Sequence, residues 1–333
     1  MRPIFFIIIL LIICSCSKKT QDKSVSKPPV VVPPVTVPPV NDTAVEYFVA
    51  PAQTDPLIDI ALDSNFISVK EKSTLKNILF VFLPGSYAAP VQYKGIVRKA
   101  AELGYHSVGL MYPDNKPVNT FCAITNDTTC HRRARLEIVD GVDRHPDINV
   151  NFNNCIINRL TKLLIFLQKN HSSENWGQFL DGSTVIWSKV IMAGHSQGGG
   201  NAAVMGKFYP VKKVIMFSMM DYMTNGKTPD WENLPANKGN YFDIFNPLDE
   251  DIPYAGAQLG WQHLGMTTDS SAAVNSDSVP FPYNHTHVLL TSKQPAKSSG
   301  PKYHNSTAMD AYVQKDTSGK YVLDKQWEFL ISE

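Results

Sequence analysis

The fold is indicated first by one run of the chain, Lys189-Val190-Ile191-Met192-Ala193-Gly194-His195-Ser196-Gln197-Gly198. Its apolar first half is typical of a buried strand, and a helix-like pattern begins near residue 197. The chain must therefore turn sharply between the two. Glycines on either side of Ser196 remove the Cβ atoms that would clash in so tight a bend. The run predicts a strand, a tight turn and a helix, a unit typical of an α/β protein.

The turn also makes Ser196 a candidate nucleophile, because a bend of this kind raises the serine hydroxyl above the end of the strand. The hydroxyl is a poor nucleophile at neutral pH, so it needs a base within hydrogen-bond reach and a carboxylate that orients the base. The alternative is a Gly-x-Ser-x-Gly sequence in an ordinary surface turn. The strand before it and the helix after it favour the nucleophile.

From residue 75 onward, strand-like apolar runs alternate with helix-like runs. This alternation predicts a mostly parallel central sheet with helices on both faces, within one domain spanning residues 42–333. Residues 42–74 are expected to add antiparallel edge strands. The expected strands are 78–83, 107–111, 190–193, 214–218, 241–245 and 287–291, and the expected helices are 91–103, 131–140, 152–169, 198–208, 254–264 and 306–313.

The strand, the Gly194-His195-Ser196-Gln197-Gly198 turn and the following helix resemble the α/β-hydrolase superfamily, over roughly residues 75–333. The resemblance implies an α/β-hydrolase fold and a triad in the chain order Ser, acid, His. The acid is then expected to be Asp249, which follows an apolar strand and precedes an Ile-Pro pair, an arrangement similar to the acid loop of many esterases. Asp221, after the preceding strand, and Asp251, in the same loop as Asp249, remain alternatives.

The base that the resemblance implies is His304, which follows the last expected strand by a loop. His285 and His287 lie before or inside that strand, so their side chains start from the wrong end of the sheet. His195 precedes the nucleophile, and its side chain is expected to point away from Ser196.

Two backbone N–H groups must face the oxyanion that develops during attack on a carbonyl. The first expected donor is Gln197. The second is Ser86 or Tyr87, in the glycine-containing loop after the strand that ends at residue 83. This loop lacks the His-Gly start of many lipases and esterases. The alternative for it is an ordinary turn.

Residues 1–16 contain a basic start, an apolar run and Ser15-Cys16, and they resemble a bacterial lipoprotein signal peptide with its lipobox. The resemblance implies lipidation of Cys16, whose acyl chains would hold the protein in a lipid bilayer. Ser17 resembles an outer-membrane sorting signal, which implies a cell-envelope location. Residues 17–41 are polar and proline-rich, as expected for an extended spacer, with a docking ligand as the alternative.

Export would place the remaining cysteines in an oxidising compartment, where disulfides persist. Cys122 and Cys130 are candidates for a short disulfide-closed loop, although a pairing with Cys155 stays open. Cys155 lies in an apolar-periodic run and is expected to be buried in a helix. A zinc site at Cys122, Cys130 and His131 has little support, since no second ligand pair has finger-like spacing.

The formal net charge is +1, which gives no field for binding nucleic acid. The sequence has no P-loop or dinucleotide fingerprint, so phosphate binding by a glycine-rich loop has no support. The expected acyl-enzyme chemistry implies no metal or organic cofactor. The segment 112–150 and the loop 266–286 are expected to shape a substrate pocket. The charged run 131–137 within the first segment is either a pocket wall or a solvated helix.

These features lead to one interpretation, an exported, membrane-anchored serine hydrolase that acts on carboxylic esters through an acyl-enzyme. A thioesterase or a peptidase would need the same residues. The alternative from another class is a non-catalytic lipoprotein that binds glycans or lipids on the same fold.

Overall fold

The computed structural model describes residues 44–70, 75–235, 240–268 and 272–333. The expected signal peptide 1–16 with Cys16, and the linker 17–41, lie outside the described residues. Internal contacts group Asn41–Glu333 into one unit. Within the described residues, none of the helices combines the length and the apolar character needed to cross a membrane.

The described strands form one large sheet in the order β1, β2, β4, β3, β7, β8, β9, β11, β10. The β1–β2 and β2–β4 pairs are antiparallel, and the other neighbouring pairs are parallel. The predictions of a mostly parallel α/β sheet and of antiparallel edge strands within residues 42–74 are confirmed. The strands are β1 Val45–Val49, β2 Asn65–Val69, β3 Leu79–Leu83, β4 His106–Gly109, β7 Val190–His195, β8 Lys213–Phe217, β9 Tyr241–Phe245, β10 Val274–Asn275 and β11 Val288–Leu290, with a separate pair, β5 Leu180–Asp181 and β6 Thr184–Val185.

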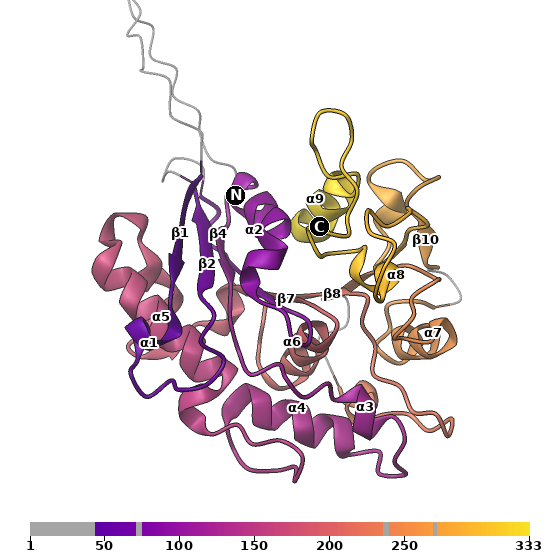
Figure 1. Ribbon diagram of the computed structural model, residues 1–333, viewed down its shortest axis with the longest axis horizontal. Helices are drawn as coiled ribbons and strands as arrows, with labels where there is room; N and C mark the ends of the chain where they lie inside the picture. Colours follow the sequence, from indigo (N-terminus) through magenta and orange to yellow (C-terminus); the bar gives the residue numbers. More distant parts are fainter. Residues whose placement is uncertain (1–43, 71–74, 236–239, 269–271) are drawn as a thin grey trace, which may run out of the picture. The chain divides into compact units, whose positions relative to one another are not determined.

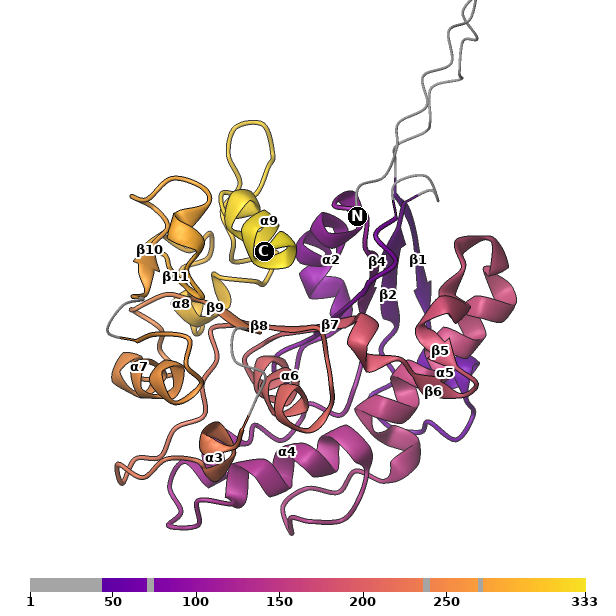
Figure 2. The ribbon, with the colours of Figure 1, turned by 180° about the vertical axis from the view of Figure 1, so that it is seen from behind.

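Helices cover both faces of the sheet because its central strands are apolar on both sides. In β3, Val81 belongs to the core cluster that includes residues of α4, α5 and α6, whereas Phe80 and Phe82 belong to the cluster that includes residues of α2 and α9. Figure 1 shows α2 and α9 on one side of β7 and β8 and α4 and α6 on the other, and Figure 2 shows the same layers from behind. The helices are α1 Pro51–Thr54, α2 Lys94–Glu102, α3 Asn119–Cys122, α4 Cys130–Asp140, α5 Ile156–Asn170, α6 Gln197–Phe208, α7 Tyr254–His263, α8 Lys302–Asn305 and α9 Asp324–Ser332.

The register of the parallel strands brings their carboxyl ends to one edge of the sheet. Leu83 pairs with Gly194, His195 with Phe217, and Phe217 with Ile244. The loops that follow β3, β7, β8 and β9 therefore begin side by side. In open parallel sheets, ligands bind at this edge.

Two predicted helical assignments are wrong. The chain forms the short helix α8 and then isolated turns, instead of a helix over 306–313, because tertiary contacts hold Asp310. Its N–H donates to Gln92 O, and its Oδ1 accepts from Gly95 N–H at 2.9 Å. Cys155 is buried as expected but precedes α5 rather than lying within it; its backbone is extended, and its sulfur accepts from Asn158 N–H at 3.5 Å.

Candidate active site

The turn between β7 and α6 holds Ser196 in an unusual backbone conformation, with φ 50° and ψ −122°. A non-glycine residue at positive φ is strained, by about 1–3 kcal/mol in such regions, and is retained where the surroundings fix it. The surroundings here are close-packed, because a Cβ at Gly194 would collide with the backbone of Gly198, and a Cβ at Gly198 with Leu83 O. The two glycines therefore allow the close approach of strand and helix that sequence analysis predicts.

His304 is almost fully buried and is held through three of its polar atoms. Its Nδ1 lies 3.0 and 2.8 Å from the two carboxylate oxygens of Asp249. Its backbone N–H donates to Glu250 Oε2 at 3.0 Å, and its carbonyl oxygen lies 3.0 Å from His195 Nε2. Among the described residues, Nε2 of His304 has no hydrogen-bond partner. The imidazole is thus oriented through Nδ1, which leaves Nε2 available as a base.

The acidic loop before α7, residues 249–251, raises the pKa of His304. Burial alone would lower the pKa of His304, but the hydrogen bond and charge of Asp249, together with the charges of Asp251 and Glu250, raise it above its usual 6.5. Asp251 Oδ2 lies 3.7 Å from His304 Nε2. Asp249 is itself fixed, because its Oδ1 accepts from the N–H groups of Asp251 at 2.9 Å and Ile252 at 2.8 Å.

The two alternative acids, Asp221 and Asp251, lie elsewhere in the structure. Asp221 is buried and forms a two-point pair with Arg135, at 2.8 Å from Nε and 2.5 Å from Nη2. It also accepts from Trp231 Nε1 at 2.9 Å. Burial alone would raise the pKa of Asp221, but the charge of Arg135 lowers it overall. The carboxylate that contacts Nδ1 of His304 is therefore that of Asp249, while Asp251 approaches Nε2.

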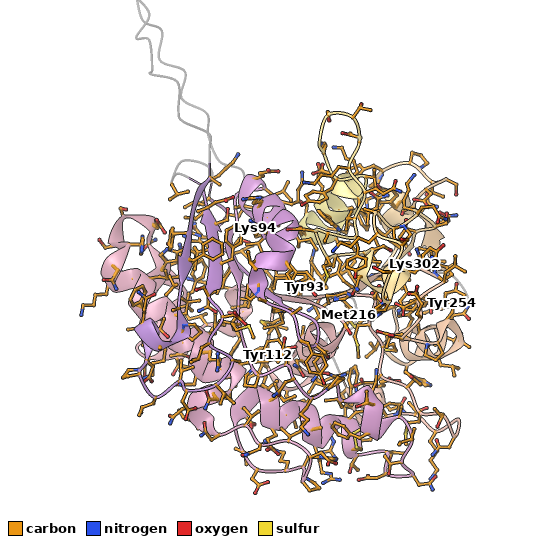
Figure 3. The ribbon with its side chains drawn as sticks, viewed as in Figure 1. Tyr93, Lys94, Tyr112, Met216, Tyr254 and Lys302 are labelled. Carbon is orange, nitrogen blue, oxygen red and sulfur yellow. A yellow bond between two sulfur atoms is a disulfide. The ribbon has the colours of Figure 1, made fainter. Side chains whose placement is uncertain are left out.

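A chain of hydrogen bonds connects three segments of the site. Gly85 N–H donates to the Tyr93 hydroxyl at 3.1 Å, the hydroxyl lies 3.0 Å from His195 Nδ1, and His195 Nε2 reaches His304 O. Burial lowers the pKa of His195 well below 6.5, so the ring is neutral. A neutral ring that donates from Nε2 accepts at Nδ1, so the Tyr93 hydroxyl is the donor to it. Figure 3 labels Tyr93, which is fully buried.

The expected oxyanion donors line the same cavity as Ser196. Gln197 is the first residue of α6, where a backbone N–H has no acceptor within the helix. Ser86 and Tyr87 lie in a turn closed by Ala88 N–H, which donates to Gly85 O at 3.2 Å. The same N–H also donates to Asp114 Oδ2 at 3.1 Å, and Tyr87 has a positive φ of 59°.

The cavity has a volume of about 520 Å³. It is lined by the expected nucleophile, base and oxyanion residues and by residues of the 112–150 segment, so this segment forms part of its wall. The described residues of the loop 266–286 do not line this cavity; Thr267 and Ala273 line another cavity of about 570 Å³. The lining residues are Gly85, Ser86, Tyr87, Ala88, Gln92, Pro117, Asn119, Thr120, Arg135, His195, Ser196, Gln197, Met219, Tyr222, Glu250, Asp251, Ile252, Pro301, His304, Asn305 and Met309.

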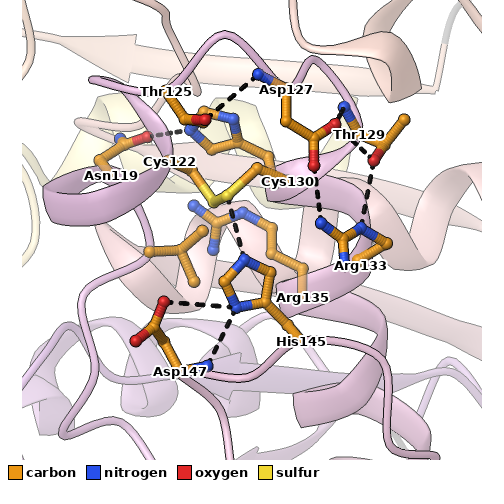
Figure 4. The surroundings of a disulfide bond; sticks show 12 residues. Asn119, Cys122, Thr125, Asp127, Thr129, Cys130, Arg133, Arg135, His145 and Asp147 are labelled. Atoms are coloured by element: carbon orange, nitrogen blue, oxygen red, sulfur yellow. Dashed lines mark hydrogen bonds and ion pairs between the residues drawn. A yellow bond between two sulfur atoms is a disulfide. The ribbon is translucent and has the colours of Figure 1, made fainter.

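A disulfide joins Cys122 and Cys130 and ties α3 to α4 in the cavity wall. Figure 4 shows His145 beside the disulfide, with Nε2 3.2 Å from Cys130 Sγ. Within the described part of the chain, Cys122, Cys130 and His145 are also the one group of His, Cys or acidic side chains close enough together to hold a metal. The sulfurs are bonded to each other here and are not thiolates, so this form of the protein lacks the ligands. His131 instead binds Asn119 Oδ1 at 2.8 Å.

Arg135 and His195 contact the backbone of site residues, which was not predicted from the sequence. The run 131–137 reads as charged surface, yet Arg135 is buried, and its Nη1 lies 3.2 Å from Gln197 O. The sequence does contain a signal for the burial of Arg135, because His131, Arg135 and Ile138 have the spacing of one helix face. No comparable local signal indicated that His195 would bind His304 O.

No protein-family model matches the chain, and no curated protein is significantly similar to it in sequence.

Proposed function

We propose that the chain is a serine hydrolase of the α/β-hydrolase superfamily that cleaves carboxylic esters through an acyl-enzyme. Ser196 is the nucleophile, His304 the general base and Asp249 the residue that orients the base. The N–H of Gln197, with that of Ser86 or Tyr87, stabilises the oxyanion.

In the proposed mechanism, His304 Nε2 takes the Ser196 hydroxyl proton as the serine oxygen attacks the ester carbonyl. The tetrahedral oxyanion collapses, the bond to the alcohol oxygen breaks, and the proton on Nε2 passes to the departing alcohol. Water then gives its proton to Nε2 as it attacks the acyl-serine, and collapse of the second intermediate releases the acid and returns the proton to Ser196. Asp249 stabilises the imidazolium in both stages.

One observation carries the proposal. Within the part of the chain that the structure describes, Nε2 is the one polar atom of His304 without a hydrogen bond, and both His304 and the strained Ser196 line one cavity. An unmet buried nitrogen costs about 1–3 kcal/mol. Among the described residues His106 and His131 also have one, but His304 is the histidine with an unmet nitrogen that lines the cavity with Ser196.

The test is fluorophosphonate labelling of the full-length protein, followed by peptide mapping. We expect an adduct on Ser196 that is absent from Ser196→Ala and strongly reduced in His304→Ala. The matched control is His285→Ala, which removes an exposed histidine paired with Glu333 and should label like the native chain. A folded native protein without an adduct would refute the proposal and favour a non-catalytic glycan- or lipid-binding lipoprotein.

We also propose that Cys16 is lipidated and anchors the protein in the cell envelope, in the outer membrane. Support comes from the sequence of residues 1–17 alone. Metabolic labelling with an alkyne analogue of palmitate should mark the native chain and not Cys16→Ser. Labelling of the serine variant would disprove the assignment.

A further inference from the structure

Asp251 lines the cavity beside His304, and the proposed mechanism assigns its carboxylate no role. Its Oδ2 lies 3.7 Å from His304 Nε2, and 53% of its side chain is exposed. Among the described residues, this carboxylate accepts no hydrogen bond, and its ion-pair partner is His304. The two preceding acids are engaged, because Asp249 contacts Nδ1 of the imidazole and Glu250 accepts from the N–H groups of Tyr303 and His304. Asp251 is therefore the acid of this loop whose carboxylate is open to a ligand.

The basic side chains around the cavity do not neutralise Asp251. Arg135 lines the cavity but is already paired with Asp221 through two hydrogen bonds. Lys116 and Lys302 adjoin lining residues in the chain, yet neither lines the cavity. Within the described part of the chain, no lysine or arginine forms an ion pair with Asp251.

The two histidines that line the cavity do not supply a cation to the form that binds substrate. His195 is neutral, because burial lowers its pKa well below 6.5. A general base must also be neutral, so His304 is uncharged when substrate binds. Burial raises the pKa of Asp251 and the charge of His304 lowers it, and the exposure of half the side chain keeps this carboxylate ionised at about pH 8. A cation on the substrate would supply the partner that Asp251 lacks.

The position of Asp251 matches that of the leaving group. In the proposed mechanism, His304 Nε2 gives its proton to the departing alcohol, whose oxygen must come within about 3.2 Å of this nitrogen. Since Asp251 Oδ2 lies 3.7 Å from the same nitrogen, the two oxygens are then no more than about 7 Å apart. A positive charge two carbon atoms from the leaving oxygen can therefore reach the carboxylate.

We propose that Asp251 makes the site selective for esters whose leaving alcohol carries a positive charge, as amino alcohols and quaternary ammonium alcohols do. This selectivity rests on the proposed function, because it uses the proton transfer at His304. The ion pair with the substrate forms on binding, before the base becomes charged. It therefore lowers KM and leaves kcat largely unchanged.

The test compares acetylcholine with 3,3-dimethylbutyl acetate, in which a carbon atom replaces the nitrogen and the charge is lost. Hydrolysis by the full-length protein is followed by acid release at constant pH, at about pH 8. We expect kcat/KM to be about fivefold higher for acetylcholine, through KM, as a partly exposed ion pair allows. Added salt should reduce this difference. Equal values of kcat/KM for the two esters in the native protein would overturn the proposal.

Variants assign the selectivity to one residue. Asp251→Asn should abolish the difference between the two esters, and Asp251→Lys should favour the neutral ester. The ratio of the two kcat/KM values cancels any effect on Ser196 or His304 that both esters share. The matched control is Asp181→Asn, which removes one exposed acidic charge outside the cavity and should keep the native ratio. A native ratio in Asp251→Asn would also overturn the proposal.

Failure of the selectivity and failure of the proposed function give different results. A protein that cleaves both esters equally well, or cleaves p-nitrophenyl acetate but neither of them, refutes the selectivity and leaves the proposed function supported. A folded protein that cleaves none of the three esters refutes the proposed function, and the selectivity fails with it.

Discussion

The substitutions Asp249→Asn and Asp221→Asn should affect different properties, because the two carboxylates have different partners. Asp249 contacts His304, the proposed base, and the corresponding change in a Ser-His-Asp triad lowers kcat by about 10⁴, since the amide favours the wrong tautomer of the histidine. The carbonyl oxygen of the new side chain can still accept from the N–H groups of Asp251 and Ile252. We therefore expect the free energy of unfolding to fall by only about 1 kcal/mol.

Asp221→Asn should act mainly on stability. Arg135 has 1% of its surface exposed, so the substitution leaves a buried guanidinium without its carboxylate. Breaking a buried pair in this way costs about 3–5 kcal/mol, a large part of the roughly 5–15 kcal/mol that stabilises a typical domain. Arg135 keeps its contact with Gln197 O, so the folded fraction should retain kcat within about tenfold, which corresponds to about 1.4 kcal/mol in the barrier.

The assay compares p-nitrophenyl acetate hydrolysis with urea unfolding for both variants, in the full-length protein. Asp251→Asn is the control in the same loop as Asp249, and it should leave kcat within about tenfold. Ester hydrolysis by Asp249→Asn at nearly the native rate would refute the assignment of Asp249. A folded Asp221→Asn as inactive as Ser196→Ala would refute it equally, because Asp221 would then be the acid.

Four other predictions concern the proposed base and the wall of its cavity. His195→Phe removes the link to the His304 carbonyl and should lower kcat/KM about 100-fold, as small displacements of catalytic groups do; an unchanged kcat/KM in steady-state assays would contradict this. Replacing Cys122 and Cys130 by serine should lower the free energy of unfolding by about 2–4 kcal/mol, and urea midpoints that match the native ones would argue against a stabilising disulfide. The base must be neutral and the pKa of His304 is raised, so kcat/KM should increase with pH through a midpoint above 6.5. Asp251→Asn removes one of the charges that raise this pKa, so its pH profile should shift to lower pH; a shift to higher pH would be the contrary result.

The sequence was sufficient for those parts of the fold that depend on local pattern. The strand before Ser196 and the strand before Asp249 are apolar runs followed by turn residues, and β9 has the predicted bounds Tyr241–Phe245. The helix expected at 306–313 failed because Asp310 bonds to residues more than two hundred positions earlier in the chain, at Gly95 and Gln92. Local propensity carries no information about such partners.

Some residues of the candidate site could likewise be predicted from the sequence, and others could not. The resemblance to the α/β-hydrolase superfamily implies Asp249 and His304, and the structure brings them into contact. The charged run around Arg135 could not be interpreted without its partner, because an arginine on a helix is exposed unless a buried carboxylate such as Asp221 meets it. That partner lies in another loop of the sheet edge.

Two neighbouring residues of the loop between β9 and α7 hold His304, one through its side chain and one through its backbone. Asp249 holds the imidazole, and the adjacent Glu250 accepts from the backbone N–H of both Tyr303 and His304. A substitution that shifts this loop is therefore expected to move Asp249 and His304 together and to preserve the distance between them. The distance that changes is the one from His304 to Ser196, which belongs to a different strand end. His195 is the residue that opposes such a shift, because it is next to Ser196 in the chain and binds the carbonyl of His304.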